Sequence, residues 1–351
     1  MQPAATTSTA ILNRGEFRGN AKEYFGIWIV NILLTIVTVG IYSAWAKVRR
    51  NRYFYGNTFF DGHSFDYHAK GLQILIGRGI VIGYLAFYNI ALQFYPIAGI
   101  ILALLMFAAL PWIVMRSLRF NARVTSYRNI RFDFVGKVGG AFFAIIVGSL
   151  VATLSLGLLA PFASRWLYRY ILNNIRYGDR ALESDPKVGA LYRVWIPAFV
   201  LVLIGVAIAG LVGLASFSSV MDGSMDQVQI VMAIYGVMIP FFVFFAIGGI
   251  FYRVGVRNVV LNATVFDGRH RLFSDMGRLR YFWIILSNFL VSMITFGLMR
   301  PWAAVREQRY VVEHTGILVD GEFSDVVASI EKSGSAITAE YLDLEGFDFG
   351  F

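Results

Sequence analysis

The sequence predicts an α-helical multi-pass membrane protein, and three observations lead to this fold class. Of the 351 residues, 57% are hydrophobic and only 15% are charged, whereas a soluble domain carries about a quarter charged residues. Several apolar stretches reach about 20 residues, the length that crosses a hydrocarbon layer roughly 30 Å thick. The third observation is a motif that recurs three times along the chain, in association with the apolar stretches.

Seven apolar stretches follow one another along the chain. Two neighbouring pairs have short or acidic connections and are expected to form helical hairpins over residues 72–115 and 195–251. The other three stretches are flanked by basic residues on both sides. The seven stretches cover approximately residues 25–46, 72–94, 96–115, 139–163, 195–216, 229–251 and 281–304.

The three stretches with basic flanks share one motif, which defines a threefold internal repeat. Each copy has a glycine (Gly40, Gly157 or Gly297), an aromatic residue five positions later, and an Arg-Tyr pair beginning twelve positions after the glycine. Two copies add a proline, Pro161 or Pro301. We expect these glycines and prolines to break the helices, because proline removes a helical hydrogen bond and glycine tolerates irregular backbone. The copies cover about residues 17–66, 131–180 and 273–323, in a membrane domain of residues 1–321.

Short β-hairpins are predicted where the repeated stretches end. Thr58–Gly62 and Thr264–Gly268 are nearly identical, and Asp-Gly between β-prone residues is a strong hairpin signal. Val319–Gly321 is a third, looser copy, and Tyr127–Phe134 is expected to supply a partner strand. Strands from several loops are therefore expected to pair into one compact cytoplasmic sheet.

Two topologies remain open for the repeated stretches. In the first, each copy enters the membrane, breaks at its glycine and returns, as broken or re-entrant helices do. Both basic flanks then lie inside, which agrees with the preference of Lys and Arg for cytoplasmic loops. The alternative is a plain seven-span helical bundle, in which each stretch crosses once and a basic flank lies outside. The first topology places the basic loops and the C-terminal tail in the cytoplasm.

The end of the chain differs in charge from the rest. Residues 322–351 contain seven acidic residues and one lysine, although the whole chain has a net charge of +9. This acidic C-terminal tail is expected either to dock against the basic loops, with a gating role, or to be solvated. The basic residues elsewhere flank apolar stretches, so they indicate membrane topology and no nucleic-acid partner.

Three polar residues inside the apolar stretches are candidates for a polar path. Arg78 is an ionisable residue at membrane depth, where charges are costly and often functional. Asn31 and Asn288 occupy equivalent positions in two repeat copies. The structural alternatives are an Arg78 side chain that extends to the interface and asparagines that fix helix packing by a hydrogen bond.

A second candidate set lies at the ends of the repeated stretches. Trp45 and Trp302 follow the repeat glycines, and Arg52, Arg169 and Arg309 begin the Arg-Tyr pairs. Arginines at the membrane surface can bind anionic lipid headgroups. The alternative is simple anchoring by an interfacial belt of aromatic residues.

No motif in the chain predicts catalysis. There is no cysteine, and the four histidines lack the short spacing of a zinc site. Phosphate-binding glycine loops and nucleophile elbows are also missing from the sequence. We therefore expect no enzyme activity, no cofactor and no metal.

Taken together, the motifs resemble the YjgN family of bacterial inner-membrane proteins, which contains a domain of unknown function. The similarity is carried by residues 24–66, above all Thr38 to Ala46 and the Asp61-Gly62 turn. It extends to the third repeat copy and to the acidic tail that ends in Phe351. The resemblance implies a location in the bacterial inner membrane, and it implies no particular activity.

Two hypotheses of function follow from these patterns. The first is transport or permeation of a small solute, ion or lipid, because transporters place binding sites at broken helices of internal repeats. The alternative is a non-catalytic scaffold or regulator that binds a protein partner through its cytoplasmic β-hairpins. Membrane lipids are expected partners in both cases, and the sequence leaves the formation of a homo-oligomer open.

Overall fold

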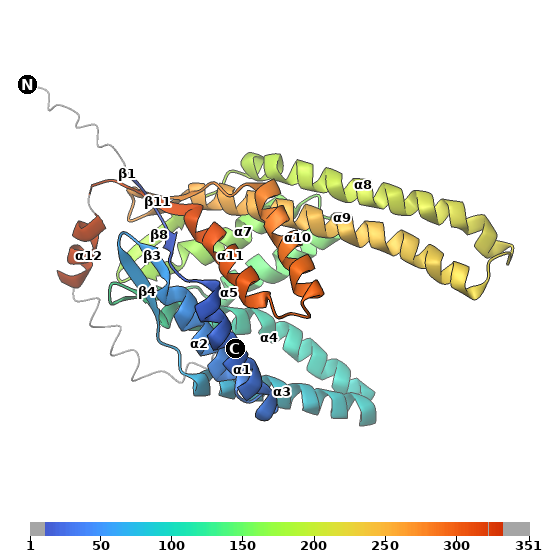
Figure 1. The fold of residues 1–351 in the computed structure, drawn as a ribbon, viewed down its shortest axis with the longest axis horizontal. Coiled ribbons are helices and arrows are strands. Elements are labelled where there is room, and N and C mark those ends of the chain that lie inside the picture. The colour runs from blue at the N-terminus through green and yellow to red at the C-terminus, as the bar shows by residue number, and fades with distance from the viewer. Residues whose placement is uncertain (1–10, 322, 333–351) are drawn as a thin grey trace, which may run out of the picture.

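The computed structural model describes residues 11–321 and 323–332. Over the first of these ranges, the helices form five antiparallel pairs, and a strand or strand pair follows each pair along the chain. Figure 1 shows that all five helical hairpins leave the same side of one sheet. A last helix, α12 (Phe323–Lys332), lies on the opposite side of that sheet.

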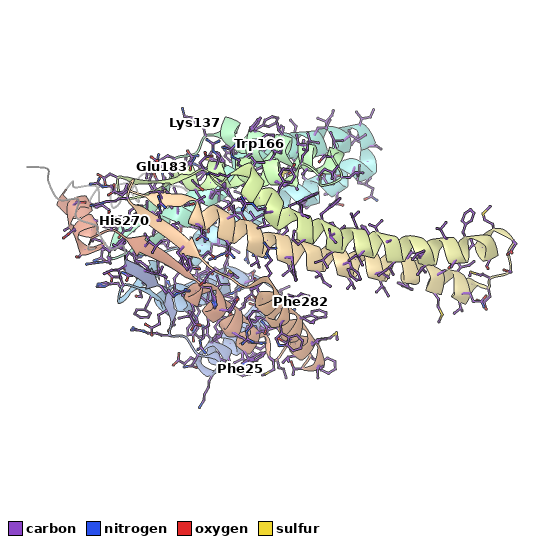
Figure 2. All side chains as sticks on the ribbon, turned by 90° about the horizontal axis from the view of Figure 1, so that it is seen from above. Phe25, Lys137, Trp166, Glu183, His270 and Phe282 are labelled. Carbon is purple, nitrogen blue, oxygen red and sulfur yellow. The ribbon has the colours of Figure 1, made fainter. Side chains whose placement is uncertain are left out.

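Two of the helical hairpins are long. They consist of α3 (Gly71–Phe94) with α4 (Pro96–Arg123), and of α8 (Val188–Met221) with α9 (Gln227–Asn262). In the described part of the chain, four helices have the length and apolar composition needed to cross a membrane, and all four belong to these hairpins. Figure 2 shows that the α8–α9 hairpin projects well beyond the rest of the molecule.

Three hairpins are short and correspond to the repeated stretches. Each reverses direction at the repeat glycine, so that both of its ends lie at the sheet (Figure 1). The glycines Gly40, Gly157 and Gly297 have φ angles of 89°, 86° and 86°, which favour glycine over other residues. The helices are α1 (Ala21–Val37) with α2 (Ser43–Gly56); α5 (Val138–Ala141), π-helical η1 (Phe142–Val147) and α6 (Gly148–Leu154) with α7 (Ala160–Asn173); and α10 (Arg278–Ile294) with α11 (Arg300–Glu313).

The five hairpins form a closed ring. Each packs against the next one along the chain, through the helix pairs α2–α3, α4–α5, α7–α8 and α9–α10. The ring closes because α11 of the last hairpin packs against α1 of the first. The chain therefore surrounds a central axis with helices from all five units.

The strands form one antiparallel sheet in the order β1-β11-β10-β9-β8-β7-β6-β5-β4-β3-β2. The two edge strands in this order, β1 and β2, are separated in the sequence only by Gly15. The two edges of the sheet therefore meet, and the sheet is a nearly closed barrel. The strands are β1 (Ile11–Arg14), β2 (Glu16–Phe17), β3 (Thr58–Phe60), β4 (His63–Tyr67), β5 (Thr125–Tyr127), β6 (Ile130–Phe134), β7 (Ile175–Tyr177), β8 (Arg180–Ser184), β9 (Thr264–Phe266), β10 (His270–Ser274) and β11 (Thr315–Val319).

The hairpin turns agree with most of the predicted ones. The Asp61-Gly62 and Asp267-Gly268 turns join β3 to β4 and β9 to β10, and both residues of each turn have positive φ. Residues 127–134 do not form a single partner strand, because Arg128 and Asn129 turn the chain between β5 and β6. The third predicted hairpin, Val319–Gly321, is wrong, since β11 leads from there to α12 and pairs with β1 and β10.

The long hairpins expose apolar side chains that water would solvate poorly. Phe94 is 68% exposed at the tip of α3, and Leu211 in α8 is 69% exposed. In the most apolar window of α9, none of the residues is buried inside the protein. A monomeric soluble protein rarely exposes contiguous apolar patches of this extent, so the natural solvent of these helices is lipid.

Candidate functional site

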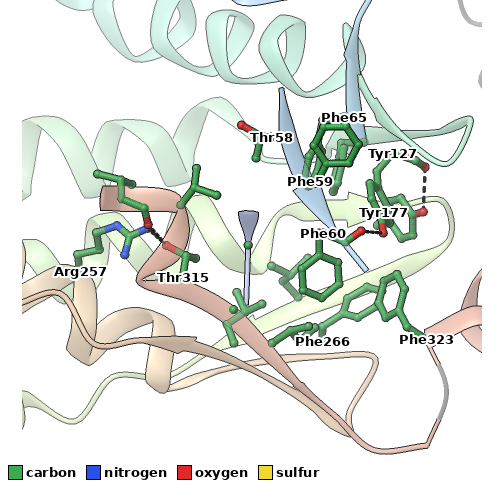
Figure 3. Close-up of a pocket in the computed structure, with 18 residues that line it drawn as sticks. Thr58, Phe59, Phe60, Phe65, Tyr127, Tyr177, Arg257, Phe266, Thr315 and Phe323 are labelled. Atoms are coloured by element: carbon green, nitrogen blue, oxygen red, sulfur yellow. Dashed lines mark hydrogen bonds between the residues drawn. The ribbon is translucent and has the colours of Figure 1, made fainter. Parts of the chain in front are cut away.

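The interior of the barrel contains a cavity of about 350 Å³ (Figure 3). Strands β4 to β10 each contribute one residue to its lining, whereas β3 and β11 each contribute three consecutive residues. The lining is mainly aromatic and aliphatic, and Arg257 of α9 brings a charge to the helical side of the cavity. The aromatic lining includes Phe60, Phe65, Tyr127, Phe132, Tyr177 and Phe266.

Helix α12 covers the end of the barrel that faces away from the ring. Its residues Val326, Val327 and Ile330 are buried in the same apolar cluster as the barrel interior. Phe323 lies 5.6 Å from Phe60, measured between ring centroids, in an edge-on contact. The start of the predicted tail is therefore docked on the barrel and is not solvated, whereas residues 333–351 lie outside the described part of the chain.

A second cavity, of about 300 Å³, lies on the helical side of the barrel, and we call it the vestibule. Helix α11 contributes Ala304, Glu307, Gln308 and Val311, whose spacing places them on one helix face. The rest of its lining comes from α2, α9, the segment before α10 and α10 itself, and it is Arg50, Phe54, Arg253, Val254, Arg257, Met276 and Tyr281.

The vestibule and the barrel cavity adjoin, because both are lined by Arg257 and Val311. The Arg257 guanidinium donates hydrogen bonds to the Ser274 hydroxyl at 2.6 Å and to the Thr315 hydroxyl at 2.7 Å (Figure 3 draws the second of these). The Tyr281 hydroxyl donates to the Glu307 carboxylate at 2.7 Å. Charged and polar groups are thus concentrated at the base of an otherwise apolar barrel.

The vestibule residues were not predicted as a site, although a weak signal for them exists in the sequence. Arg50 and Glu307 each stand eight positions before the strand that follows their helix. Arg257 and Gln308 stand seven positions before theirs. Polar residues at a fixed distance from successive strands form a layer below the sheet, but this signal is visible only when the strand positions are known.

The predicted polar path residues are not brought together. Arg78 donates a hydrogen bond to the Ser43 hydroxyl, which joins α3 to the start of α2. Asn288 donates to the Ala303 carbonyl oxygen at 3.1 Å, and Arg306 donates to its side-chain oxygen at 3.1 Å. The side-chain oxygen of Asn31 is buried without a hydrogen-bond partner among the described residues. None of the three lines the barrel cavity or the vestibule.

The arginines predicted to bind lipid headgroups contact the protein itself. Arg52 donates to the Tyr67 carbonyl oxygen at 3.3 Å, and Arg309 donates to the Gly19 carbonyl oxygen at 2.9 Å. Arg169 lies 3.5 Å from the Asp185 carboxylate. All three therefore bridge a helix to the segment that leads from a strand into a neighbouring helix.

The two predicted interfacial tryptophans also have partners inside the protein. Trp45 packs at the start of α3, where a side chain on Gly71 would collide with its ring. Trp302 stacks with the Arg306 guanidinium, 5.1 Å from the ring centroid. The Trp45 contact fixes α2 against the start of α3, whereas the Trp302 contact lies within α11.

His270 is a fully buried polar side chain of the sheet, with an exposed fraction of 0%. Its Nδ1 atom accepts a hydrogen bond from the Asp320 backbone N–H at 3.1 Å, close to the start of α12. Its Nε2 atom is buried without a partner among the described residues. Burial lowers the pKa of this imidazole below its ordinary value, and the neighbouring Arg269 lowers it further.

The fold and the two cavities define a class of protein: an integral membrane protein in which helical hairpins surround an axis and a barrel-like sheet covers one end. A family model for a bacterial protein of unknown function, DUF898, matches residues 13–344. The chain belongs to this family. No solved structure matches it.

Curated relatives agree with this assignment. Inner membrane protein YjgN of Salmonella typhimurium is 25% identical over an alignment of length 348 that covers 87% of this chain and 88% of the relative. The protein of the same name from Escherichia coli O157:H7 is 23% identical over the same shares of both chains. A shorter match to YjgN of Escherichia coli K12 is 31% identical and covers 40% of this chain and 36% of the relative. The apolar helices and these relatives together place the chain in the bacterial inner membrane.

Proposed function

We propose that this inner-membrane protein lets a small solute cross the membrane along the axis of the helical ring. The observation that carries the proposal is the vestibule, a polar cavity among the hairpins that adjoins the barrel interior. A purely structural bundle would fill such a space with apolar side chains, because a polar cavity at the base of an apolar barrel adds no packing energy. In this mechanism α12 covers the far end of the path and has to move when solute passes.

The orientation of the path follows from charge. The tips of the long hairpins carry either no charge, at Phe94–Pro96, or only acidic residues, at Asp222 and Asp226. Basic residues are concentrated instead in the helix ends next to the sheet, as in Arg49, Arg50 and Arg52. Because Lys and Arg favour cytoplasmic positions, the sheet and α12 face the cytoplasm and the long tips face outward.

The short hairpins act as re-entrant helices in this proposal. Their tips are apolar and exposed, with exposed fractions of 91% for Val39, 86% for Leu156 and 98% for Phe296. Lipid tolerates such a tip only when its backbone groups are satisfied internally. The backbone N–H groups of the tip glycines are satisfied in this way. Those of Gly40 and Gly297 donate hydrogen bonds to the carbonyl oxygens five residues earlier, at 2.7 and 2.6 Å.

The three tips also use the same side-chain contact, which supports a common repeat. A hydroxyl two residues before each glycine accepts a hydrogen bond from the backbone N–H four residues further on. Thr38, Ser155 and Thr295 supply these hydroxyls, at distances of 2.9, 3.0 and 3.2 Å. We infer that the threefold repeat is a set of three short units, between which the two long hairpins are inserted.

A matching hydrogen bond closes each short hairpin at the sheet. The hydroxyls of Tyr53, Tyr170 and Tyr310 donate to the carbonyl oxygens of Asn20, Lys137 and Gly277. Donor and acceptor are 33 residues apart in the sequence in all three cases. The repeated Arg-Tyr pair therefore has a structural reason, since its tyrosine ties the end of the hairpin to its beginning.

A liposome swelling assay tests the proposed permeation. Purified protein is reconstituted into liposomes, which are then exposed in turn to glycerol, potassium chloride, potassium glutamate and potassium phosphate. We expect at least one solute to enter faster than in protein-free liposomes. Gln308→Trp fills the vestibule and is expected to abolish the effect, whereas Gln227→Trp, on the exposed start of α9, leaves it unchanged.

If correctly folded protein gives no swelling with any of the four solutes, the permeation proposal is wrong. The scaffold hypothesis would then be favoured. The sheet itself argues against a scaffold that recruits a partner strand, because each described strand pairs with neighbours and the two ends of the sheet meet at Gly15. An exposed sheet edge would be needed for that kind of binding.

A further inference from the structure

The vestibule carries an excess of positive charge. Arg50 reaches it from α2, and Arg253 and Arg257 reach it from α9, one turn of the helix apart. The one acidic residue in the lining is Glu307 of α11. Three guanidinium groups therefore share a cavity of about 300 Å³ with a single carboxylate.

The three arginines of the vestibule are not neutralised by an ion pair with Glu307. Arg257 donates to two hydroxyl groups, of Ser274 and Thr315, which carry no charge. The contact found for the Arg50 guanidinium is the ring of Phe54, at 5.7 Å. Arg253 makes no hydrogen bond or ion pair with any described residue, and Glu307 bonds to the hydroxyl of Tyr281. The basic side chains of the cavity are thus available to a ligand.

The residues surrounding these charges explain why an anion is favoured. The walls include the apolar side chains of Phe54, Val254 and Val311, which keep the local dielectric constant low. A cleft with low-dielectric walls and charges of one sign concentrates ions of the opposite sign. The planar guanidinium group matches two oxygen atoms of a phosphate or carboxylate group, and several such groups together favour a doubly charged anion.

We propose that the vestibule binds a phosphate group between Arg50 and Arg253, with Arg257 adding positive charge from the barrel side. The inference rests on the proposed function in treating the vestibule as the solute's entry site. The phosphate group belongs either to a soluble phosphate compound that crosses the membrane or to the headgroup of a membrane phospholipid. Both sources offer the same chemistry to the three arginines, and the experiment separates them.

The first measurement is the binding of radiolabelled inorganic phosphate to the full chain in mild detergent, by equilibrium dialysis. We expect saturable binding that weakens about tenfold or more in Arg253→Gln and in Arg50→Gln, because each removes a charge-assisted contact. Arg280→Gln removes the same charge from an exposed position outside the vestibule and is expected to bind as the wild type does. Arg253→Lys keeps the charge and is expected to retain part of the affinity.

The second measurement compares nanodiscs of phosphatidylcholine with nanodiscs that also contain phosphatidylglycerol. Equal phosphate binding in both assigns the site to a soluble phosphate compound, and weaker binding in the anionic discs assigns it to a lipid headgroup. The proposal is overturned if phosphate does not bind, or binds equally to wild type, Arg50→Gln and Arg253→Gln. If Arg253→Gln does not fold, the phosphate affinities of the two single variants Arg50→Gln and Arg253→Lys test the proposal instead. Swelling by glycerol or chloride without phosphate binding would leave the permeation proposal intact and remove this one.

Discussion

At the scale of the residue, His270 links the barrel to the start of α12 and is expected to make stability depend on pH. Its imidazole is buried, and Nδ1 must be unprotonated to accept the hydrogen bond from Asp320. The pKa in the folded protein is lowered from the ordinary value of 6.5, chiefly by burial and next by Arg269, while Asp267 and Asp320 oppose this effect. A lowered pKa means that the folded state resists protonation more than the unfolded state does.

The sign of the effect follows from this difference. Stability is fully present above the unfolded pKa of 6.5 and is lost as the pH falls through the lower folded value. We therefore expect the melting temperature to drop between about pH 7 and about pH 5. His270→Asn cannot be protonated, and its side-chain oxygen can still accept from Asp320, so this variant is expected to show a weaker pH dependence. His63→Asn, at an exposed position, is expected to resemble the wild type, and an unchanged pH dependence in His270→Asn would contradict the assignment.

Some side-chain roles in this protein can be predicted from the sequence, and others cannot. The turn at Asp61-Gly62 was predictable because positive φ angles restrict the residue types of two adjacent positions. The partner of Arg78 was not predictable, since it depends on which neighbouring helix faces the side chain. Ser43 comes 35 residues before Arg78, and the sequence contains no sign that the two meet.

At the scale of the element, the short hairpins can be tested by adding cysteines to a chain that has none. The tip side chains Val39, Leu156 and Phe296 are exposed, so no protein atom protects a cysteine there from a reagent. If the tips lie in hydrocarbon, Val39→Cys and Phe296→Cys are expected to resist a charged maleimide in intact membranes and to react with it after denaturation in detergent, because a thiol in lipid stays protonated and only the thiolate is nucleophilic. Labelling in membrane vesicles, followed by gel shift, measures both reactions.

Two control positions report the sides of the membrane. His63→Cys, at the exposed start of β4, is expected to react with the charged maleimide only when the reagent reaches the cytoplasmic face. Asp222→Cys, at the exposed tip of α8–α9, is expected to react from the outer face. Rapid labelling of Phe296→Cys by the charged reagent would show that the tip lies in water, and the re-entrant hairpin would then be wrong.

The elements also show why the predicted threefold pattern describes only part of the ring. The long hairpins lack the glycine motif, and their tips lie at Tyr95 and at residues 222–226. Their second helices nevertheless lead into strand pairs in the same way as those of the short hairpins. Helix α12 was not predicted in the acidic tail, since five apolar residues in ten give little signal without the barrel they cover.

At the scale of the whole molecule, the ring depends on one short segment. The strand pair β1–β2 joins the last unit to the first, with β1 against β11 and β2 against β3. Arg14 holds the end of β1 through two hydrogen bonds to the Asp275 carboxylate, at 3.0 and 2.6 Å. This closure brings together residues from both ends of the chain, and no local pattern in the sequence could predict it, although the individual hairpins were predictable.

Gly15 is the position at which the closure is most sensitive to substitution. A Cβ atom there would lie 2.8 Å from the Val312 Cγ1 atom and 2.9 Å from the Val312 carbonyl oxygen, so either the strand or α11 has to shift. We expect Gly15→Ala to lower the free energy of unfolding by about 1–3 kcal/mol, as overpacking does in other close contacts. Chemical denaturation in mild detergent measures this loss. Gly56→Ala, where a Cβ atom meets nothing within 4 Å, is the matched control and is expected to be neutral or slightly stabilising. Because the strain in Gly15→Ala lies at the junction of the first and last units, equal stability of the two variants would mean that the ring does not close through this segment.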